Sequence, residues 1–330
     1  MSRLTSALLL AILTFSAGTA IGAQTAAPEY PTRPIRMLIP FAPGGATDII
    51  ARILEPKLSK RLGQQVVVDN RTGAAGNIAV ELTAQAQPDG YTLLVGNIST
   101  NSINPILFAK TMKVNALKDL RGVSKLVAIP NFILGSPKLP ANTLKEALDY
   151  AKARPGQLNV ASVATGSSQH LMGELFNIMT GVKMTHVPYK GGAQGIIDLM
   201  GGSVQASFSN AINVIPHIRA GKLKGLAITG AKRTASVPQV PTYAEGGLPD
   251  YDPKNFQGML APAGTPRAIV NKLSDEIRKI LQMPQIVERL TNGGMEPYHT
   301  GPEKMAAEMK RAYEETARVA KIANIKVDDL

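Results

Sequence analysis

The chain has 330 residues and a formal net charge of +12 at pH 7, with no cysteine and no tryptophan. The absence of cysteine excludes disulfides, a lipid-anchored cysteine and cysteine-based zinc sites. The positive charges are scattered as single residues and pairs, without the basic stripe and interleaved aromatic side chains expected of a nucleic-acid-binding protein. We therefore expect small anions rather than nucleic acid as partners, and a fold stabilised by its core alone.

The first residues have the pattern of an export signal. Arg3 supplies a positive start, Ala7–Phe15 forms an apolar stretch, and small residues follow through Ala23. The apolar stretch is shorter than the roughly 20 residues that a transmembrane helix needs. We therefore predict a signal peptide over residues 1–23 and a mature protein that is periplasmic or secreted. The remaining chain is long enough for two domains of about 100 to 200 residues each.

Strand-like runs alternate with helical patterns in the first part of the chain. The run Ile35–Ile39 is followed by apolar residues at helical spacing over Ile49–Leu62, and Gly63 is placed to end that helix. Further strands are expected at Val66–Val68 and Tyr91–Val95, each followed by a polar loop. This alternation predicts βα units around a parallel sheet.

The same alternation returns in the middle of the chain, from about Val123. Thr143–Glu146 has the pattern of a capping box that opens a helix, which is expected to stop at Pro155. A second helix is expected to follow Thr165–Ser168 and to end at Gly181. The further strands of this part are expected at Leu158–Val163, Met184–Pro188, Val204–Ser209 and Leu223–Thr229.

These patterns predict an α/β fold with two lobes. Residues 24–122 and 246–330 are expected to form lobe 1, because the mostly helical tail returns to it, and residues 123–245 are expected to form lobe 2. In open parallel sheets, ligands bind beyond the carboxyl ends of the strands. The loops that should meet there are Phe41–Asp48, Gly96–Asn101, Thr165–Ser168 and Ser209–Asn210.

The loop Phe41–Asp48 is the strongest candidate for a binding element. A strand that turns through Gly44 and Gly45 into a helix leaves backbone N–H groups that can hold a carboxylate or phosphate. The alternative is an ordinary turn capped by Thr47 or Asp48, and the loop alone does not decide between the two. Its glycine spacing matches neither the dinucleotide motif nor the P-loop.

The sequence gives little support for catalysis or metal binding. The four histidines, including His170 and His186, show no metal-ligand spacing. Ser167 and His170 lie three residues apart, which raises the alternative of a secreted hydrolase. However, the serine is not in a G-x-S-x-G elbow and no carboxylate partner is identifiable, so a helix-capping serine is favoured. We predict no catalytic residues, no metal site and no cofactor.

Seven short motifs follow one another over nearly the whole mature chain. They are Tyr30–Arg36, Pro40–Asp48, Val67–Gly73, Pro88–Leu93, His186–Gly191, Pro216–Gly221 and Ala261–Pro266. Together they resemble the Bug family of substrate-binding proteins, which serve tripartite tricarboxylate transporters. The resemblance implies a type II periplasmic-binding-protein-like fold whose two lobes close over a small carboxylate.

The resemblance also implies partners and a role. The protein would be a monomeric periplasmic receptor, not an enzyme, that delivers its ligand to integral-membrane permease subunits. A binding module that feeds a membrane sensor is the other alternative. Members of the family grip a ligand carboxylate with the first Gly-Gly loop and the facing loop of lobe 2, often through ordered waters. Carried over, the implied ligand-binding residues are Phe41, Gly44, Gly45, Ala46, Thr47, Asp48, Ser99, Thr100, Thr165, Ser167, Ser168, His170, Tyr189, Ser209 and Asn210.

Two departures from the family pattern bear on the ligand. Ser209 stands where relatives often place an acidic residue, so an amino-acid ligand is less favoured, although Asp48 offers a carboxylate for a ligand amine. Phe256 stands where relatives often carry tryptophan, so an aromatic wall there would be smaller. We expect a di- or tricarboxylate, or an aromatic carboxylate.

Overall fold

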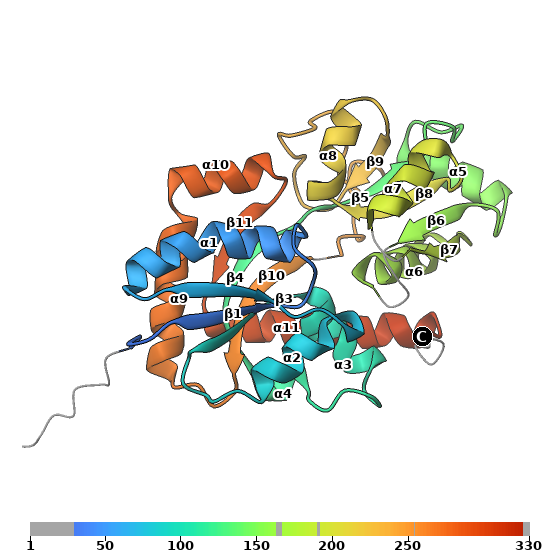
Figure 1. Ribbon diagram of the computed structural model, residues 1–330. Coiled ribbons are helices and arrows are strands. Elements are labelled where there is room, and N and C mark those ends of the chain that lie inside the picture. Colours follow the sequence, from blue (N-terminus) through green and yellow to red (C-terminus); the bar gives the residue numbers. More distant parts are fainter. Residues whose placement is uncertain (1–29, 163–166, 190–191, 254, 326–330) are drawn as a thin grey trace, which may run out of the picture.

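The computed structural model describes residues 30–162, 167–189, 192–253 and 255–325, which form two α/β lobes (Figure 1). The predicted signal peptide, residues 1–23, lies outside the described residues. Within the described part of the chain, no helix combines the length and the apolar character needed to cross a membrane.

Lobe 1 is built on a six-stranded sheet. The strands lie in the order β11-β4-β10-β3-β1-β2, with β1 parallel to β2 and β3, and with β10 antiparallel to β3 and β4. Their bounds are β1 Ile35–Ile39, β2 Val66–Asn70, β3 Thr92–Asn97, β4 Leu120–Ala128, β10 Phe256–Pro262 and β11 Glu296–Thr300.

Helices cover both faces of this sheet because the strand residues are apolar on both sides. Ile35, Met37 and Ile39 of β1 pack with α1, α9 and α10, whereas Leu38 packs with α2 and α11. The helices are α1 Ala46–Leu62, α2 Asn77–Ala84, α9 Arg267–Leu281, α10 Pro284–Asn292 and α11 Pro302–Ile322. Shorter turns are η1 Ala74–Gly76, η2 Ser99–Ile103, α3 Asn104–Leu107 and α4 Ala116–Asp119.

Lobe 2 repeats this three-layer arrangement around a five-stranded sheet, ordered β7-β6-β8-β5-β9. Helices α5 and α6 pack on one face and α7 and α8 on the other. The strands are β5 Asn131–Gly135, β6 Asn159–Ser162, β7 Thr185–Pro188, β8 Ala206–Asn210 and β9 Lys224–Ile228. The helices are α5 Leu144–Ala153, α6 Ser168–Thr180, α7 Gly192–Gly201 and α8 Ala211–Arg219.

Strand pairing and core packing favour other lobe boundaries than those expected. Strand β4 pairs with β10 and β11 of lobe 1, so a boundary at residue 123 would cut this strand. Tyr243 and Tyr251 belong to the core of lobe 2, so the return crossing lies after residue 251. We therefore propose lobe boundaries near residues 129 and 255. The apolar run from Val123 identified a strand but carried no information about its partners.

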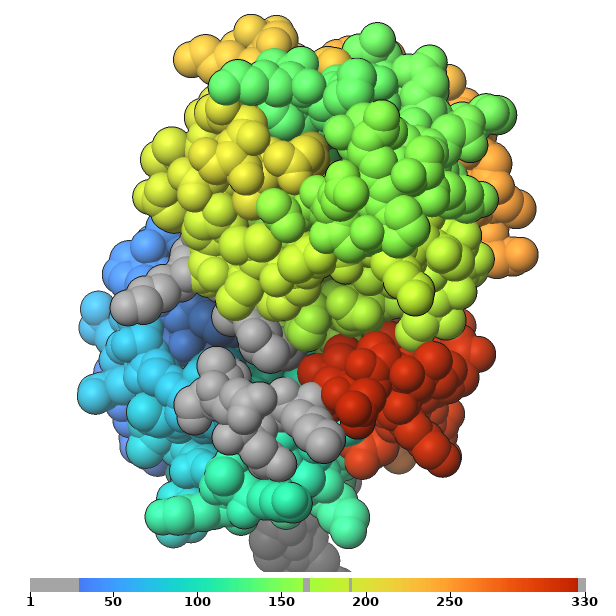
Figure 2. Space-filling model, turned by 90° about the vertical axis from the view of Figure 1, so that its right-hand side faces the viewer, coloured from blue at the N-terminus to red at the C-terminus, as the bar shows by residue number. Residues whose placement is uncertain are grey.

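Among the described residues, the contacts between the lobes include the return crossing and helix α11. Asn255 Nδ2 donates a hydrogen bond of 2.9 Å to Asn210 Oδ1 across the return crossing. Helix α11 of lobe 1 also contacts α6 of lobe 2, where Leu171 lies in the same apolar cluster as Met309 and Val319. Figure 2 shows the red C-terminal helix directly below the yellow-green part of lobe 2.

Strand direction brings the lobe 1 site elements to one edge of the sheet. Because β1 and β3 are parallel, the loops Phe41–Asp48 and Gly96–Asn101 follow them at the same edge. The antiparallel β10 begins there, and Gln257 pairs with Asn97. The α/β fold with two lobes, predicted from the sequence, is confirmed.

Candidate functional site

The loop after β1 leaves a helix N-terminus without a side-chain cap. Helix α1 begins at Ala46, three residues before the apolar pattern starts, and its N-cap residue is Gly45. Among the described residues, no side chain caps the helix at Gly45. The first N–H groups of a helix have no partner within the helix, and the helix dipole makes this end attractive to anions. Gly44 takes φ +86°, which glycine tolerates best.

Asp48 holds this loop in shape. Its carboxylate is buried and accepts hydrogen bonds from Gly44 N at 2.9 Å, Arg52 Nε at 2.9 Å and Asn70 Nδ2 at 3.0 Å. Asn70 Nδ2 also donates to Phe41 O at 2.9 Å. Burial alone would raise the pKa of Asp48, but these donors hold it below its usual range. The carboxylate therefore bonds within lobe 1, and a contact between Asp48 and a ligand amine stays a prediction.

Thr47 is also used within lobe 1. Its hydroxyl donates a hydrogen bond of 2.8 Å to Gln257 Oε1, and both side chains are buried. This contact ties the first turn of α1 to the start of β10. Gln257 was missed in the sequence because it lies 210 residues from Thr47.

The loop after β3 forms the neighbouring wall of lobe 1. Thr100 is fully buried, its backbone N–H donates to Asn97 Oδ1 at 3.1 Å, and its hydroxyl donates to Asn97 O at 3.0 Å. Its methyl group lies against Gly76, where a Cβ atom would come within 2.8 Å. Thr100 therefore packs beneath the surface of this loop. Ser99 is only partly buried.

The predicted binding loop of lobe 2 leads into helix α6. We call this loop the lobe 2 jaw and the loop Phe41–Asp48 the lobe 1 jaw. Ser167 is the N-cap residue, and its hydroxyl accepts a hydrogen bond from His170 N at 3.2 Å. Ser168 Oγ lies 3.1 Å from Gln169 Oε1, to which it donates. Thr165 lies outside the described residues. The capping role favoured for Ser167 is therefore confirmed.

His170 belongs to a stacked histidine pair. Its ring lies 3.8 Å from that of His186, with an interplanar angle of 17°, and its Nε2 lies 3.7 Å from Glu174 Oε1. Burial, with a smaller effect of His186, lowers the pKa of His170 to about 4. Burial also lowers the pKa of His186, whose Nε2 lies 2.5 Å from Ser162 Oγ. Both rings are therefore neutral near pH 7.

Three further predicted residues also bond within the protein. The Tyr189 hydroxyl donates to Asp198 Oδ2 at 2.8 Å, and burial together with Asp198 raises its pKa to about 12. Ser209 Oγ lies 3.0 Å from Ser207 Oγ. Asn210 accepts the bond from Asn255 that joins the lobes. Tyr189 thus packs inside lobe 2, while Asn210 lies at the junction of the lobes.

Phe256 does not form an aromatic wall. Only 2% of its surface is exposed, and Lys125 Nζ lies 4.2 Å from the centre of its ring. The Lys125 ammonium also contacts Tyr298 and pairs with Glu308. Phe256 is therefore part of the lobe 1 core.

These loops lie at the carboxyl ends of parallel strands in two α/β lobes. A family model described as the tripartite tricarboxylate transporter family receptor, TctC, matches residues 50–326. The chain belongs to this family. The recognition of a Bug-type protein is confirmed, since BugT of Bordetella pertussis is 39% identical over 90% of this chain and 91% of its own length.

Solved structures similar to this TctC receptor include that of the periplasmic binding protein BugD, which is 33% identical, with a TM-score of 0.78 over 90% of this chain and 99% of the other. An R. palustris protein solved with adipate is 35% identical, with a TM-score of 0.81 over 90% of this chain and 99% of the other. MatC from Rhodopseudomonas palustris, solved with bound malate, is 32% identical, with a TM-score of 0.77 over 88% of this chain and 99% of the other.

Membership of the family settles the question of catalysis. TctC proteins are receptors and not enzymes, so the prediction that the chain is not an enzyme is confirmed and the hydrolase alternative is wrong. Among the described side chains, no group of three or more His, Asp or Glu residues is placed to hold a metal.

Proposed function

We propose that this TctC receptor binds a small organic carboxylate between its lobes, in the periplasm, and delivers it to the permease subunits of a tripartite tricarboxylate transporter. The observation that carries the proposal is the start of α1. The Asp48 network shapes a loop that leaves the helix without a side-chain cap, which provides amide donors and a favourable dipole for an anion.

The chemistry of the relatives supports the same ligand class. One structural neighbour carries adipate and another malate, and both ligands are small dicarboxylates. In our proposal, the amides of Gly45, Ala46 and Thr47 receive one carboxylate. Ser167, Ser168, Ser209 and Asn210 line the opposite wall, and Asp48, Thr100 and Tyr189 position their neighbours.

Thermal and calorimetric titration with a panel of carboxylates tests ligand binding. The panel includes adipate, malate and a monocarboxylate, with adipamide as the matched neutral control. A ligand at 100 times its dissociation constant should raise the free energy of unfolding by about 2.7 kcal/mol, whereas adipamide should give no comparable increase. A panel without any stabilising carboxylate would refute the proposal.

Export and delivery need separate tests. Expression of the full chain in a Gram-negative host should give a periplasmic protein that has lost about 20 N-terminal residues, as checked by mass spectrometry. Co-purification with ligand present should recover integral-membrane permease subunits. Recovery of sensor kinase components alone would instead support the sensor alternative.

A further inference from the structure

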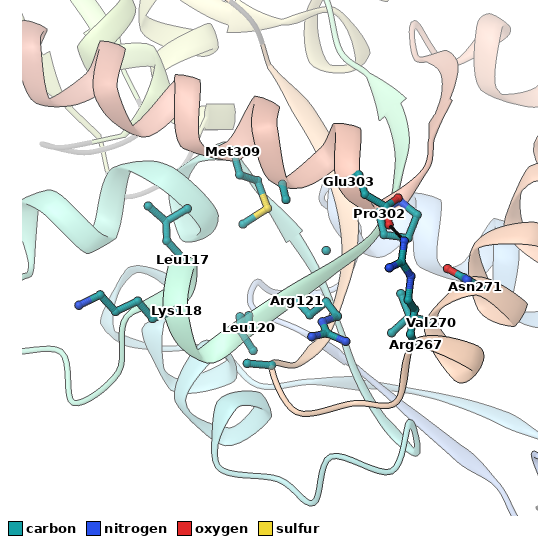
Figure 3. Close-up of a pocket in the computed structure, with 13 residues that line it drawn as sticks. Leu117, Lys118, Leu120, Arg121, Arg267, Val270, Asn271, Pro302, Glu303 and Met309 are labelled. Atoms are coloured by element: carbon teal, nitrogen blue, oxygen red, sulfur yellow. Dashed lines mark hydrogen bonds and ion pairs between the residues drawn. The ribbon is translucent and has the colours of Figure 1, made fainter.

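A second pocket lies in lobe 1, at the sheet edge opposite to the proposed carboxylate site. It has a volume of about 420 Å³ and is formed by α4, the start of β4, the start of α9 and the start of α11 (Figure 3). Strand β4 runs from Arg121 at this pocket to Ala128 near the lobe junction. Seven residues of strand span about 23 Å, so the two sites are separate.

The floor of this pocket is apolar. It includes Leu117, Leu120, Val270 and Met309, and three of these side chains are buried. Pockets that bind small organic molecules usually combine such a floor with a few convergent polar groups, and their volumes are about 300 to 1,000 Å³. The size and lining of this pocket therefore suit the apolar body of a small ligand.

The rim supplies positive charge. Arg121 and Arg267 both line the pocket, and Figure 3 shows Arg121 between Leu120 and Arg267. Arg267 pairs with Glu303 at 2.6 Å. Arg121 Nη1 donates to Thr265 O at 2.9 Å, but Arg121 has no acidic partner among the described residues. Among the described residues, the acidic group that lines the pocket, Glu303, therefore pairs with Arg267 and not with Arg121.

Two helices also begin at this rim. The first residues of α9, Arg267, and of α11, Pro302, line the pocket, and the helices have 15 and 21 residues. Their dipoles add positive potential to that of Arg121. The acidic side chain in the lining, Glu303, lies in the first turn of α11 and is already paired with Arg267. An anionic group beside Arg121 would therefore meet an unpaired cation, whereas a cationic group there would be repelled.

We propose that this pocket is a second ligand site, for a small monoanion with an apolar body, such as an arylalkyl carboxylate. The anionic group binds at Arg121, and the apolar body lies over Leu117, Leu120, Val270 and Met309. The site is contained in one lobe, so its occupation does not need the lobes to close. This inference is independent of the proposed ligand between the lobes.

Met309 allows the site to be tested directly, because its methyl group reports on the pocket floor. In an NMR experiment, the protein labelled with ¹³C-methyl methionine is titrated with 4-phenylbutyrate and, as the matched control, with 4-phenylbutylamine. A Met309→Leu variant assigns the signal. We expect a saturable shift of the Met309 methyl signal with the carboxylate and none with the amine.

Three variants decide where the probe binds. Arg121→Gln should weaken the binding of 4-phenylbutyrate about ten-fold, as expected for a lost charge-assisted hydrogen bond at an exposed site. Ala306→Trp, at an exposed rim position, should abolish the titration by filling the pocket. Ala46→Pro, in the interlobe site, should leave it unchanged. The absence of a saturable shift, equal affinity in all variants, or loss only in Ala46→Pro would overturn the proposal.

Discussion

The two jaws of the proposed carboxylate site both begin helices, but only one of these helices is capped. The N-cap residue of α1, Gly45, has no side chain that could accept a hydrogen bond from the first amides of the helix. In α6, the hydroxyl of Ser167 accepts a hydrogen bond from His170 N. A capped helix has already satisfied one of its free amides. The difference indicates that lobe 1 offers backbone amides to an anion, while lobe 2 contributes side chains.

The largest expected effect comes from the carboxylate that shapes the lobe 1 jaw. Asp48→Ala removes acceptors for Gly44, Arg52 and Asn70, and should lower the free energy of unfolding by about 3 to 4 kcal/mol. Urea unfolding measures the loss, with Asp48→Asn as a control that keeps one acceptor. Carboxylate binding should weaken in parallel. A variant as stable as the parent would show that Asp48 does not support the loop.

The lobe 2 jaw should respond to pH through His170, whose pKa is about 4 in the folded protein and 6.5 ordinarily. As the pH falls below 6.5, the unfolded chain takes up a proton that the folded protein resists. The free energy of unfolding should therefore fall by about 2 to 3 kcal/mol between pH 6.5 and 4, with no contribution above this range.

His170→Phe is the matched variant for this pH dependence, because it keeps an aromatic ring against His186. Denaturant unfolding from pH 4 to 8 should give a shallower pH profile for the variant than for the parent. Identical profiles would show that another group causes the loss of stability.

The free amides of the lobe 1 jaw can be tested one at a time. Ala46→Pro removes one N–H at the first helical position, where proline fits the backbone, and Gly45 before it is already extended. Loss of one charge-assisted hydrogen bond should weaken the binding of the carboxylate at least about ten-fold, as measured by calorimetry. Ala46→Ser keeps the amide and should bind normally. Equal affinity in both variants would place the carboxylate elsewhere.

The smallest effect is expected for the cap itself. Ser167→Ala should lower the free energy of unfolding by about 1 kcal/mol, because His170 N loses its acceptor, whereas Ser167→Asn should restore most of it. Thermal unfolding measures both. A larger loss of carboxylate affinity than of stability in Ser167→Ala would show that this hydroxyl also contacts the ligand.

Local features of the fold could be predicted from the sequence because their causes are local. Strand Ile35–Ile39 was placed correctly, the helix caps at Gly63 and Gly181 take the left-handed conformation, and Thr143 accepts a bond from Glu146 N. Each of these signals lies within a few residues of its effect.

The internal partners of the site could not be predicted because they depend on distant strands. Asp48 meets Asn70, Thr47 meets Gln257, and Asn210 meets Asn255, with separations of 22, 210 and 45 residues. The sequence therefore predicts which loops form the candidate site, but not which of their side chains bond to distant parts of the protein.

Helix α11 has a mechanical consequence for any movement of the lobes. Its first turn lies at the far edge of lobe 1, and its later turns contact α6 of lobe 2. Any rotation of one lobe relative to the other must either slide α6 along α11 or expose part of the apolar cluster that holds Leu171 and Val319. If the helices slide, the contact stays buried and guides the rotation. If they separate, the apolar area that becomes exposed adds to the free energy of the lobe movement.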